Sequence, residues 1–127
     1  MPAPGNQVWR ILVVDDEPAV RNAIRMMLKF DGHAVQTADG GAEALPLLEA
    51  GQFDLVITDY SMPGMKGDEL AAVIKGRLPR QPIIMISAFA ETLKSSGNPL
   101  AGVDFIISKP FSLADLREAV ARVLPGS

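Results

Sequence analysis

The segment that decides the fold reads DLVITDYSMPGMKG, from Asp54 to Gly67. It opens with the apolar run Leu55 to Ile57, reaches a carboxylate at Asp59 and continues into a Met-Pro-Gly sequence. A near-continuous apolar run rich in β-branched residues is typical of a strand covered on both faces. Proline followed by glycine marks a turn. The segment therefore predicts a buried strand that ends at an aspartate and is followed by a loop.

Similar apolar runs recur along the chain, with segments of helical character between them. The runs are Ile11 to Val14, Ile83 to Ile86 and Phe105 to Ile107, with a weaker one from His33 to Thr37. The alternation of five strands with five helices predicts a doubly wound α/β fold around a parallel sheet, with right-handed crossovers. In such folds ligands bind beyond the carboxyl ends of the strands, so we expect the functional residues there.

Apolar residues at helical spacing indicate three of the helices. The stripes are Val20, Ile24, Met27 and Leu28; Leu70, Val73, Ile74 and Leu78; and Leu116, Ala119, Val120 and Val123. Ser112 and Asp115 predict a capping box at the start of the last helix. Pro46 lies inside the second helical segment, where we expect a kink or a late start. The sequence SSGNPL from Ser95 to Leu100 predicts a fourth helix that is short or irregular.

Composition limits the function classes. The 127 residues, 48% of them hydrophobic, fit one domain, which we place at residues 9–125 behind a flexible tail at 1–8. The net charge of −3 and the lack of a long basic run disfavour direct nucleic-acid binding. No cysteine is present, which fits a cytoplasmic protein, and we see neither a signal peptide nor a membrane span. The lone histidine, His33, is expected at the surface or in a structural role.

Polar residues follow the predicted strands at their carboxyl ends. Asp15 and Asp16 end the first strand, Asp59 the third, Ser87 the fourth and Lys109 the fifth. Since parallel strands end side by side, these residues should converge on one pocket. Three neighbouring carboxylates repel one another unless a cation lies among them. Oxygen ligands favour Mg²⁺, or Mn²⁺ in its place, whereas zinc would require histidine or cysteine.

Each of these residues also has a simpler explanation. Asp15 and Asp16 suit a helix cap before Pro18, Asp59 suits a turn, and Lys109 suits a solvated surface. Taken singly, these explanations are common. They would all have to hold together at consecutive strand ends, so a shared site is the better interpretation.

The motifs match a known family. ILVVDDEP at Ile11 to Pro18, the segment at Asp54 to Gly67, Ser87 with Ala88, and KPF at Lys109 to Phe111 resemble receiver domains of response regulators. This CheY-like superfamily belongs to two-component signalling. The resemblance covers about residues 10–124 and implies a five-stranded parallel sheet flanked by five helices. It further implies a signalling switch rather than a conventional enzyme, one that catalyses its own phosphorylation and slow self-hydrolysis.

The resemblance also assigns roles. It implies that Asp59 accepts a phosphoryl group from a phosphohistidine, and that Mg²⁺ is bound by Asp16, Asp59 and the backbone carbonyl of Ser61, with Asp15 acting through water. Lys109 would pair with the phosphoryl oxygens and Ser87 would hydrogen-bond to one of them.

Further positions are implied by the same resemblance. The peptide bond before Pro110 would be cis, and Ser61 and Phe89 would flank the path of the hydrolytic water. For Phe89, packing against the fourth helix is an equal alternative. The family's switch aromatic falls at Ile106, while the aromatic Phe105 is one residue earlier and points to the other face. We therefore expect the Ser95 to Leu100 segment to carry much of the conformational response.

The resemblance implies several partners. A sensor histidine kinase or a histidine phosphotransfer protein would donate the phosphoryl group. The signal would pass to a downstream protein or to an output domain outside this sequence, with a phosphorylation-dependent homodimer as a further option. The KPFSLADL segment, from Lys109 to Leu116, also looks like receivers attached to hybrid histidine kinases.

Two other classes compete with this interpretation. A haloacid-dehalogenase-like phosphohydrolase needs a second acid two residues after its nucleophile, where this chain has Ser61. A degenerate receiver, used only for binding, would not need the complete set of Asp16, Asp59, Ser87 and Lys109.

Overall fold

The computed structural model describes residues 8–95 and 102–124. Nearly all of the expected tail at 1–8 and of the Ser95 to Leu100 segment lies outside the described residues. The strands are β1 (Arg10–Val14), β2 (Ala34–Ala38), β3 (Leu55–Asp59), β4 (Ile83–Ser87) and β5 (Phe105–Ser108). The helices are α1 (Pro18–Phe30), α2 (Gly41–Ala50), α3 (Gly67–Arg77), α4 (Ala90–Ser95) and α5 (Leu113–Val123).

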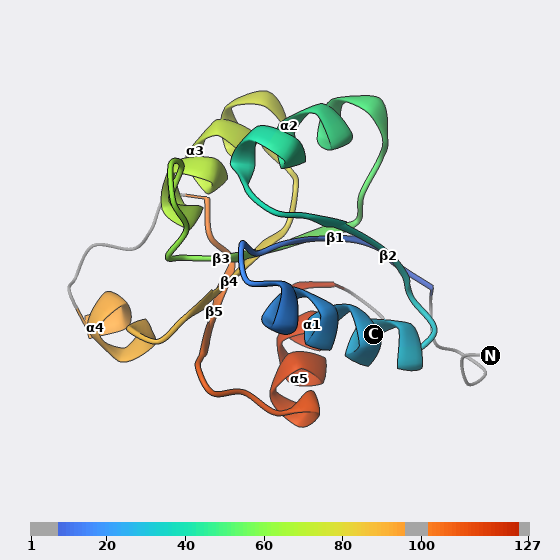
Figure 1. The fold of residues 1–127 in the computed structure, drawn as a ribbon, viewed down its shortest axis with the longest axis vertical. Helices are drawn as coiled ribbons and strands as arrows, with labels where there is room; N and C mark the ends of the chain where they lie inside the picture. The colour runs from blue at the N-terminus through green and yellow to red at the C-terminus, as the bar shows by residue number, and fades with distance from the viewer. Residues whose placement is uncertain (1–7, 96–101, 125–127) are drawn as a thin grey trace.

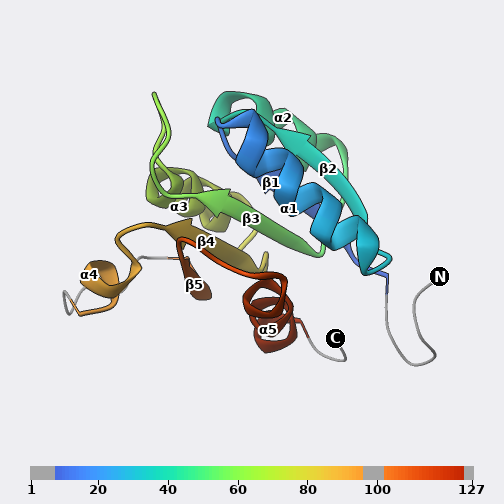
Figure 2. The same cartoon turned by 60° about the horizontal axis from the view of Figure 1, so that its bottom comes forward.

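The five strands form one parallel sheet in the order β2-β1-β3-β4-β5. Figure 1 shows α2 and α3 on one side of the sheet and α1 and α5 on the other, with α4 beyond β5. The view in Figure 2 shows the same layers from a second direction. The doubly wound fold predicted from the sequence is thus confirmed. Its chain order reverses between β1 and β3, which is where ligands bind in folds of this class.

The central strands supply two cores, one on each face of the sheet. Alternate residues of β1 point to opposite faces: Ile11 and Val13 pack with α1 and α5, while Leu12 and Val14 pack with α2 and α3. All residues of β3 and β4 are buried. This burial on both faces explains why these strands appear in the sequence as unbroken apolar runs.

The helix ends follow the local sequence in most cases. Pro18 occupies the first turn of α1, where its missing N–H matters least. At α5, the Asp115 backbone N–H donates to the Ser112 hydroxyl and the Ser112 N–H donates to the Asp115 carboxylate, which confirms the predicted capping box. The fourth helix is short, as expected, with six residues. None of the helices in the described ranges has the length and apolar character needed to cross a membrane.

Pro46 departs from one expectation. The helix α2 already begins at Gly41, so a late start is wrong. Ala44 and Leu48, on either side of the proline, are buried against the sheet and belong to one core. Their burial holds both halves of the helix in place and offsets the missing backbone hydrogen bond at Pro46.

Candidate functional site

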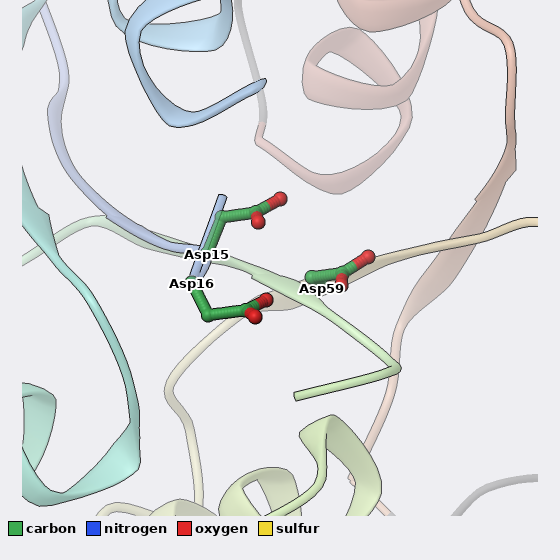
Figure 3. Close-up of side chains that lie close together, drawn as sticks. All are labelled: Asp15, Asp16 and Asp59. Carbon is green, nitrogen blue, oxygen red and sulfur yellow. The ribbon is translucent and has the colours of Figure 1, made fainter. Parts of the chain in front are cut away.

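Three carboxylates meet at the carboxyl edge of the sheet, where β1 and β3 end. Asp15, Asp16 and Asp59 each place an oxygen so that these atoms lie within 4.8 Å of one another. Figure 3 shows Asp15 and Asp16 following β1, with Asp59 beside them at the end of β3. The sequence prediction that these residues converge is therefore realised in the structure, at the point where the chain order reverses.

Asp15 is fully buried, and its two oxygens have different surroundings. Oδ1 accepts a hydrogen bond from the Glu17 N–H at 2.9 Å, while Oδ2 is buried and has no hydrogen-bond partner among the described residues. The pKa of Asp15 is raised to about 6, mainly by burial; the Glu17 N–H opposes this increase, and the charge of Asp59 contributes to it. Capping of the chain before α1 explains only the position of Oδ1, which accepts the Glu17 N–H. The orphaned Oδ2 is an acceptor that a cation would satisfy.

Asp59 is 3% exposed and is paired with Lys109. The Lys109 Nζ lies 2.8 Å from the Asp59 Oδ1. Burial raises the pKa of Asp59 even though the hydrogen bond from Lys109 lowers it. Burial alone would lower the pKa of Lys109, but the hydrogen bond and charge of Asp59 outweigh it, so this pKa is raised. The Lys109 ammonium therefore does not offset the cost of burying the Asp59 carboxylate, to which the charge of Asp16 adds. A divalent cation bound here would lower the pKa of Asp59.

Ser87 and Lys109 lie next to each other at the ends of β4 and β5. The Lys109 backbone N–H donates to the Ser87 carbonyl at 3.0 Å. Ser87 is buried, and its Oγ accepts a hydrogen bond from the Phe89 N–H at 2.9 Å. That bond uses a lone pair, so the hydroxyl proton remains available to a further acceptor. The peptide bond between Lys109 and Pro110 is cis.

The other residues singled out in the sequence lie around this cluster. Ser61 is exposed in the loop after β3, and the Phe89 side chain is 57% exposed. Ile106 is half-buried in β5 and lies opposite Met85 in the sheet register. Phe105 packs against the core shared with α1 and α5, so it does not take the position of Ile106.

Two contacts were not anticipated from the sequence. The Arg21 Nη1 donates to the Asp15 carbonyl at 2.8 Å, which ties α1 to the end of β1. Gly67 lies so close to the strand that a Cβ built on it would be 2.2 Å from the Asp59 carbonyl oxygen. The Gly67 N–H also donates to the Tyr60 carbonyl at 2.9 Å. The sequence feature that could have predicted this close approach is the glycine at the start of α3, a few residues after the Pro-Gly turn.

The chemistry of the donors fits a hard divalent cation. All three clustered ligands are carboxylate oxygens, one of them an orphaned acceptor, and the cluster contains neither histidine nor cysteine. Mg²⁺ and Mn²⁺ prefer such oxygen ligands, whereas zinc and copper favour nitrogen or sulfur. The described residues could therefore hold a cation of the Mg²⁺ type.

Comparisons with known proteins agree with this architecture. The family model for the response regulator receiver domain matches residues 11–121. The chemotaxis protein CheY-3 of Vibrio cholerae is 38% identical over 121 residues, which cover 93% of both chains. CheY of Pseudomonas aeruginosa is 35% identical over 117 residues, covering 90% of this chain and 94% of that protein.

Solved structures give the same result. The response regulator protein TrrA from Thermotoga maritima, in complex with Mg²⁺-BeF, has a TM-score of 0.82 and 35% identity, with 92% of this chain and all of that chain covered. CheY4 of Vibrio cholerae has a TM-score of 0.84 and 29% identity. The chain belongs to the response regulator receiver domain family, and it is a phospho-accepting domain of two-component signalling.

Proposed function

We propose that Asp59 is the phosphoacceptor and that Mg²⁺ is held by Asp16, Asp59 and the Ser61 carbonyl, with Asp15 acting through water. The observation that carries this proposal is the cluster itself, with its buried, unpartnered Asp15 oxygen and its raised carboxylate pKa values. When bound, the metal would neutralise charge on the carboxylates and on the transferring phosphoryl group.

The residues of the chain divide the remaining work. A carboxylate oxygen of Asp59 attacks phosphorus, the N–P bond of the donor phosphohistidine breaks, and its electron pair stays on the imidazole. Lys109, already 2.8 Å from Asp59, is placed to pair with the phosphoryl oxygens. The Ser87 hydroxyl oxygen accepts the Phe89 backbone N–H, and its O–H donates a hydrogen bond to a phosphoryl oxygen once the acyl phosphate has formed.

The donor in this proposal is a sensor histidine kinase or a histidine phosphotransfer protein, and the signal passes to a protein partner or an output domain. The response regulators FleR of Pseudomonas aeruginosa and MprA of Mycobacterium tuberculosis match over only 26% and 46% of their lengths, so those proteins extend beyond the shared region. We place the exchange in the cytoplasm, in keeping with a chain that has no cysteine for disulfides.

We propose that the conformational switch of this domain differs from the family's usual one, in which an aromatic side chain occupies the position of Ile106. Ile106 is smaller than an aromatic side chain, and Phe105 packs against the core shared with α1 and α5. The response would then be carried by the Ser95 to Leu100 segment, most of which lies outside the described residues. Amide exchange with and without beryllofluoride tests this step, and unchanged protection in that segment would contradict it.

Slow self-hydrolysis is a further part of the proposal. Phe89 is 57% exposed and its backbone N–H donates to the Ser87 hydroxyl, and these observations support a role for its bulky apolar side chain near the phosphorylation site. It would hinder the approach of the hydrolytic water together with Ser61. Replacing Phe89 with Glu or Ala should shorten the phosphoryl lifetime, and an unchanged lifetime would refute the role.

The deciding experiment is phosphorylation in vitro. Incubation with Mg²⁺ and acetyl phosphate should add the mass of one phosphoryl group, and the Asp59→Asn variant should add none. Steady release of phosphate without accumulation would favour a phosphohydrolase. A lack of both phosphorylation and beryllofluoride binding would favour a receiver used only for binding.

A further inference from the structure

Two hollows lie at the amino edge of the sheet, opposite the carboxylate cluster. The larger, of about 610 Å³, lies between the end of α2, the start of β3 and the segment after α3. The smaller, of about 260 Å³, lies between α3, the start of β4 and the end of α5. Arg80 and Pro82 line both hollows, so they form one continuous surface, which we call the amino-edge groove.

Positive charge gathers in the smaller hollow. Its lining includes three cationic side chains, Lys75, Arg80 and Arg122, against one carboxylate, Asp104. The Asp104 Oδ2 is already engaged, because it lies 3.3 Å from the Lys75 Nζ and accepts the Ile83 N–H at 2.8 Å. The hollow therefore carries an excess of positive charge in a chain whose net charge is −3.

The two arginines are available to a partner. The Arg122 guanidinium lies 3.4 Å from the Glu118 carboxylate, and both side chains are at least 60% exposed, so this pair contributes little. Arg80 forms neither a hydrogen bond nor an ion pair with the described part of the chain. A guanidinium matches a carboxylate through two parallel hydrogen bonds, and neither arginine has a strong competing contact.

The larger hollow adds an apolar floor. Leu48 and Phe53 line it together with Leu78, which is 40% exposed. Arg77 and Asp54 line the same hollow; Arg77 is paired with Glu49, and the Asp54 Oδ2 accepts the Arg10 backbone N–H at 2.8 Å. The amino-edge groove thus combines an apolar floor with cations that extend past Arg80 into the smaller hollow, and its volume exceeds that of an inorganic anion.

We propose that the amino-edge groove docks an acidic segment of a protein partner in which carboxylates alternate with leucine-like side chains. The carboxylates would pair with Arg80 and Arg122, and the apolar side chains would cover Leu78 and its neighbours. A nucleic acid suits the surface less well, because the cations are few and the floor of the larger hollow is apolar. The amino-edge groove lies at the opposite edge of the sheet from Asp59, so a partner bound there leaves the phosphorylation site open.

The test uses the unphosphorylated full chain, labelled with ¹⁵N, and a peptide of alternating glutamate and leucine as the probe. The largest amide shifts are expected at residues 75–82, 104 and 122–123. Arg80→Gln and Arg122→Gln should each weaken binding roughly fivefold, the effect of about 1 kcal/mol at an exposed charge pair. Lys29→Gln is the matched control, since it removes an exposed cation near the same edge but outside the groove, and it should bind as the parent does.

Each outcome decides between the possible ligands. The same shifts from inorganic phosphate alone, or tighter binding of a single-stranded oligonucleotide, would overturn the assignment to a protein partner. Equal binding to a glutamine–leucine peptide, or an Arg80→Gln variant that binds unchanged, would overturn the charge argument. Peptide binding by Asp59→Asn should equal that of the parent, so the result does not depend on the proposed phosphoacceptor. Thermal melting of the Arg80 variant checks that its fold is retained.

Discussion

The two edges of the sheet carry opposite charge patterns. At the carboxyl edge, Asp15, Asp16 and Asp59 lie together, and Lys109 is paired with Asp59. At the amino edge the pattern is inverted, with three cations around one carboxylate in the smaller hollow of the groove. The carboxyl edge of the sheet is therefore acidic, whereas the smaller hollow at the amino edge has an excess of cations.

The two edges of the sheet differ more in the burial of their charged side chains than in the sign of their charge. Asp15 and Asp59 are 0% and 3% exposed, and this burial is the main reason that the pKa values of both are raised. At the amino edge the Arg122 side chain is 66% exposed, and water screens it. The buried negative charge at the carboxyl edge would be stabilised by a bound cation, which suits this edge to phosphoryl transfer. Exposed charge of the other sign gives a surface suited to recognition.

The largest expected effect comes from removing the cation at the acidic end. Lys109→Gln should lower the rate of phosphorylation by acetyl phosphate by about 10²–10³, the effect of losing one donor to a developing charge. Lys29→Gln, the same change at the exposed end of α1 near the amino edge, should leave the rate unchanged. Intact-mass time courses measure both rates. Equal rates in the two variants would remove Lys109 from the chemistry.

The second prediction compares the two ends of one helix. Gly67 begins α3 against the Asp59 carbonyl, while Gly76, near its other end, has open space where a Cβ would lie. Gly67→Ala should lower the free energy of unfolding by about 2–3 kcal/mol, because backbone rather than a flexible side chain blocks the new atom. Gly76→Ala should raise it by about 1 kcal/mol, from helix propensity. Urea denaturation measures both, and changes of the same sign would contradict the packing argument.

The contrast between these glycines shows what the sequence could predict. Asp15, Asp16 and Asp59 were expected together because parallel strands end side by side, a rule that needs no side-chain detail. Their catalytic roles stay predictions. The contact of Gly67 with the Asp59 carbonyl depends on how the loop after β3 closes, which local pattern does not determine.

The amino-edge groove was not anticipated for a related reason. Its cations come from the end of α3, the loop before β4 and the end of α5, which no single motif connects. At Pro46 the sequence predicted a kink or a late helix start, and the late start is wrong, because α2 begins at Gly41 and the flanking Ala44 and Leu48 are buried. Strand ends are set by sheet register and most helix ends by local sequence, whereas the hollows between the elements are set by packing.

The third prediction concerns the cation required at the acidic end. Mg²⁺ at about one hundred times its dissociation constant should raise the free energy of unfolding by about 2.7 kcal/mol, because it binds only the folded cluster. Asp16→Asn should lose most of this gain, while Glu118→Gln, an exposed acid on α5, should keep it. Thermal melting with Mg²⁺ and with a chelator measures the difference. A gain in Asp16→Asn equal to that of the parent would argue against the proposed ligands.

The smallest expected effect is a pH dependence at the amino edge. The Trp9 backbone N–H donates to the His33 Nδ1 at 3.1 Å, and burial lowers the pKa of His33, with Asp31 opposing the shift. Because the folded pKa lies below the unfolded one, this stability is present above the ordinary pKa of about 6.5 and is lost as the pH falls through the folded value. Loss of the hydrogen bond costs about 1 kcal/mol. Asp15, whose pKa is raised, contributes the opposite slope, so the quantity to measure is the difference in melting temperature between His33→Gln and the parent across this range. The difference should shrink as the pH falls, and parallel curves would show that His33 does not titrate in the folded chain.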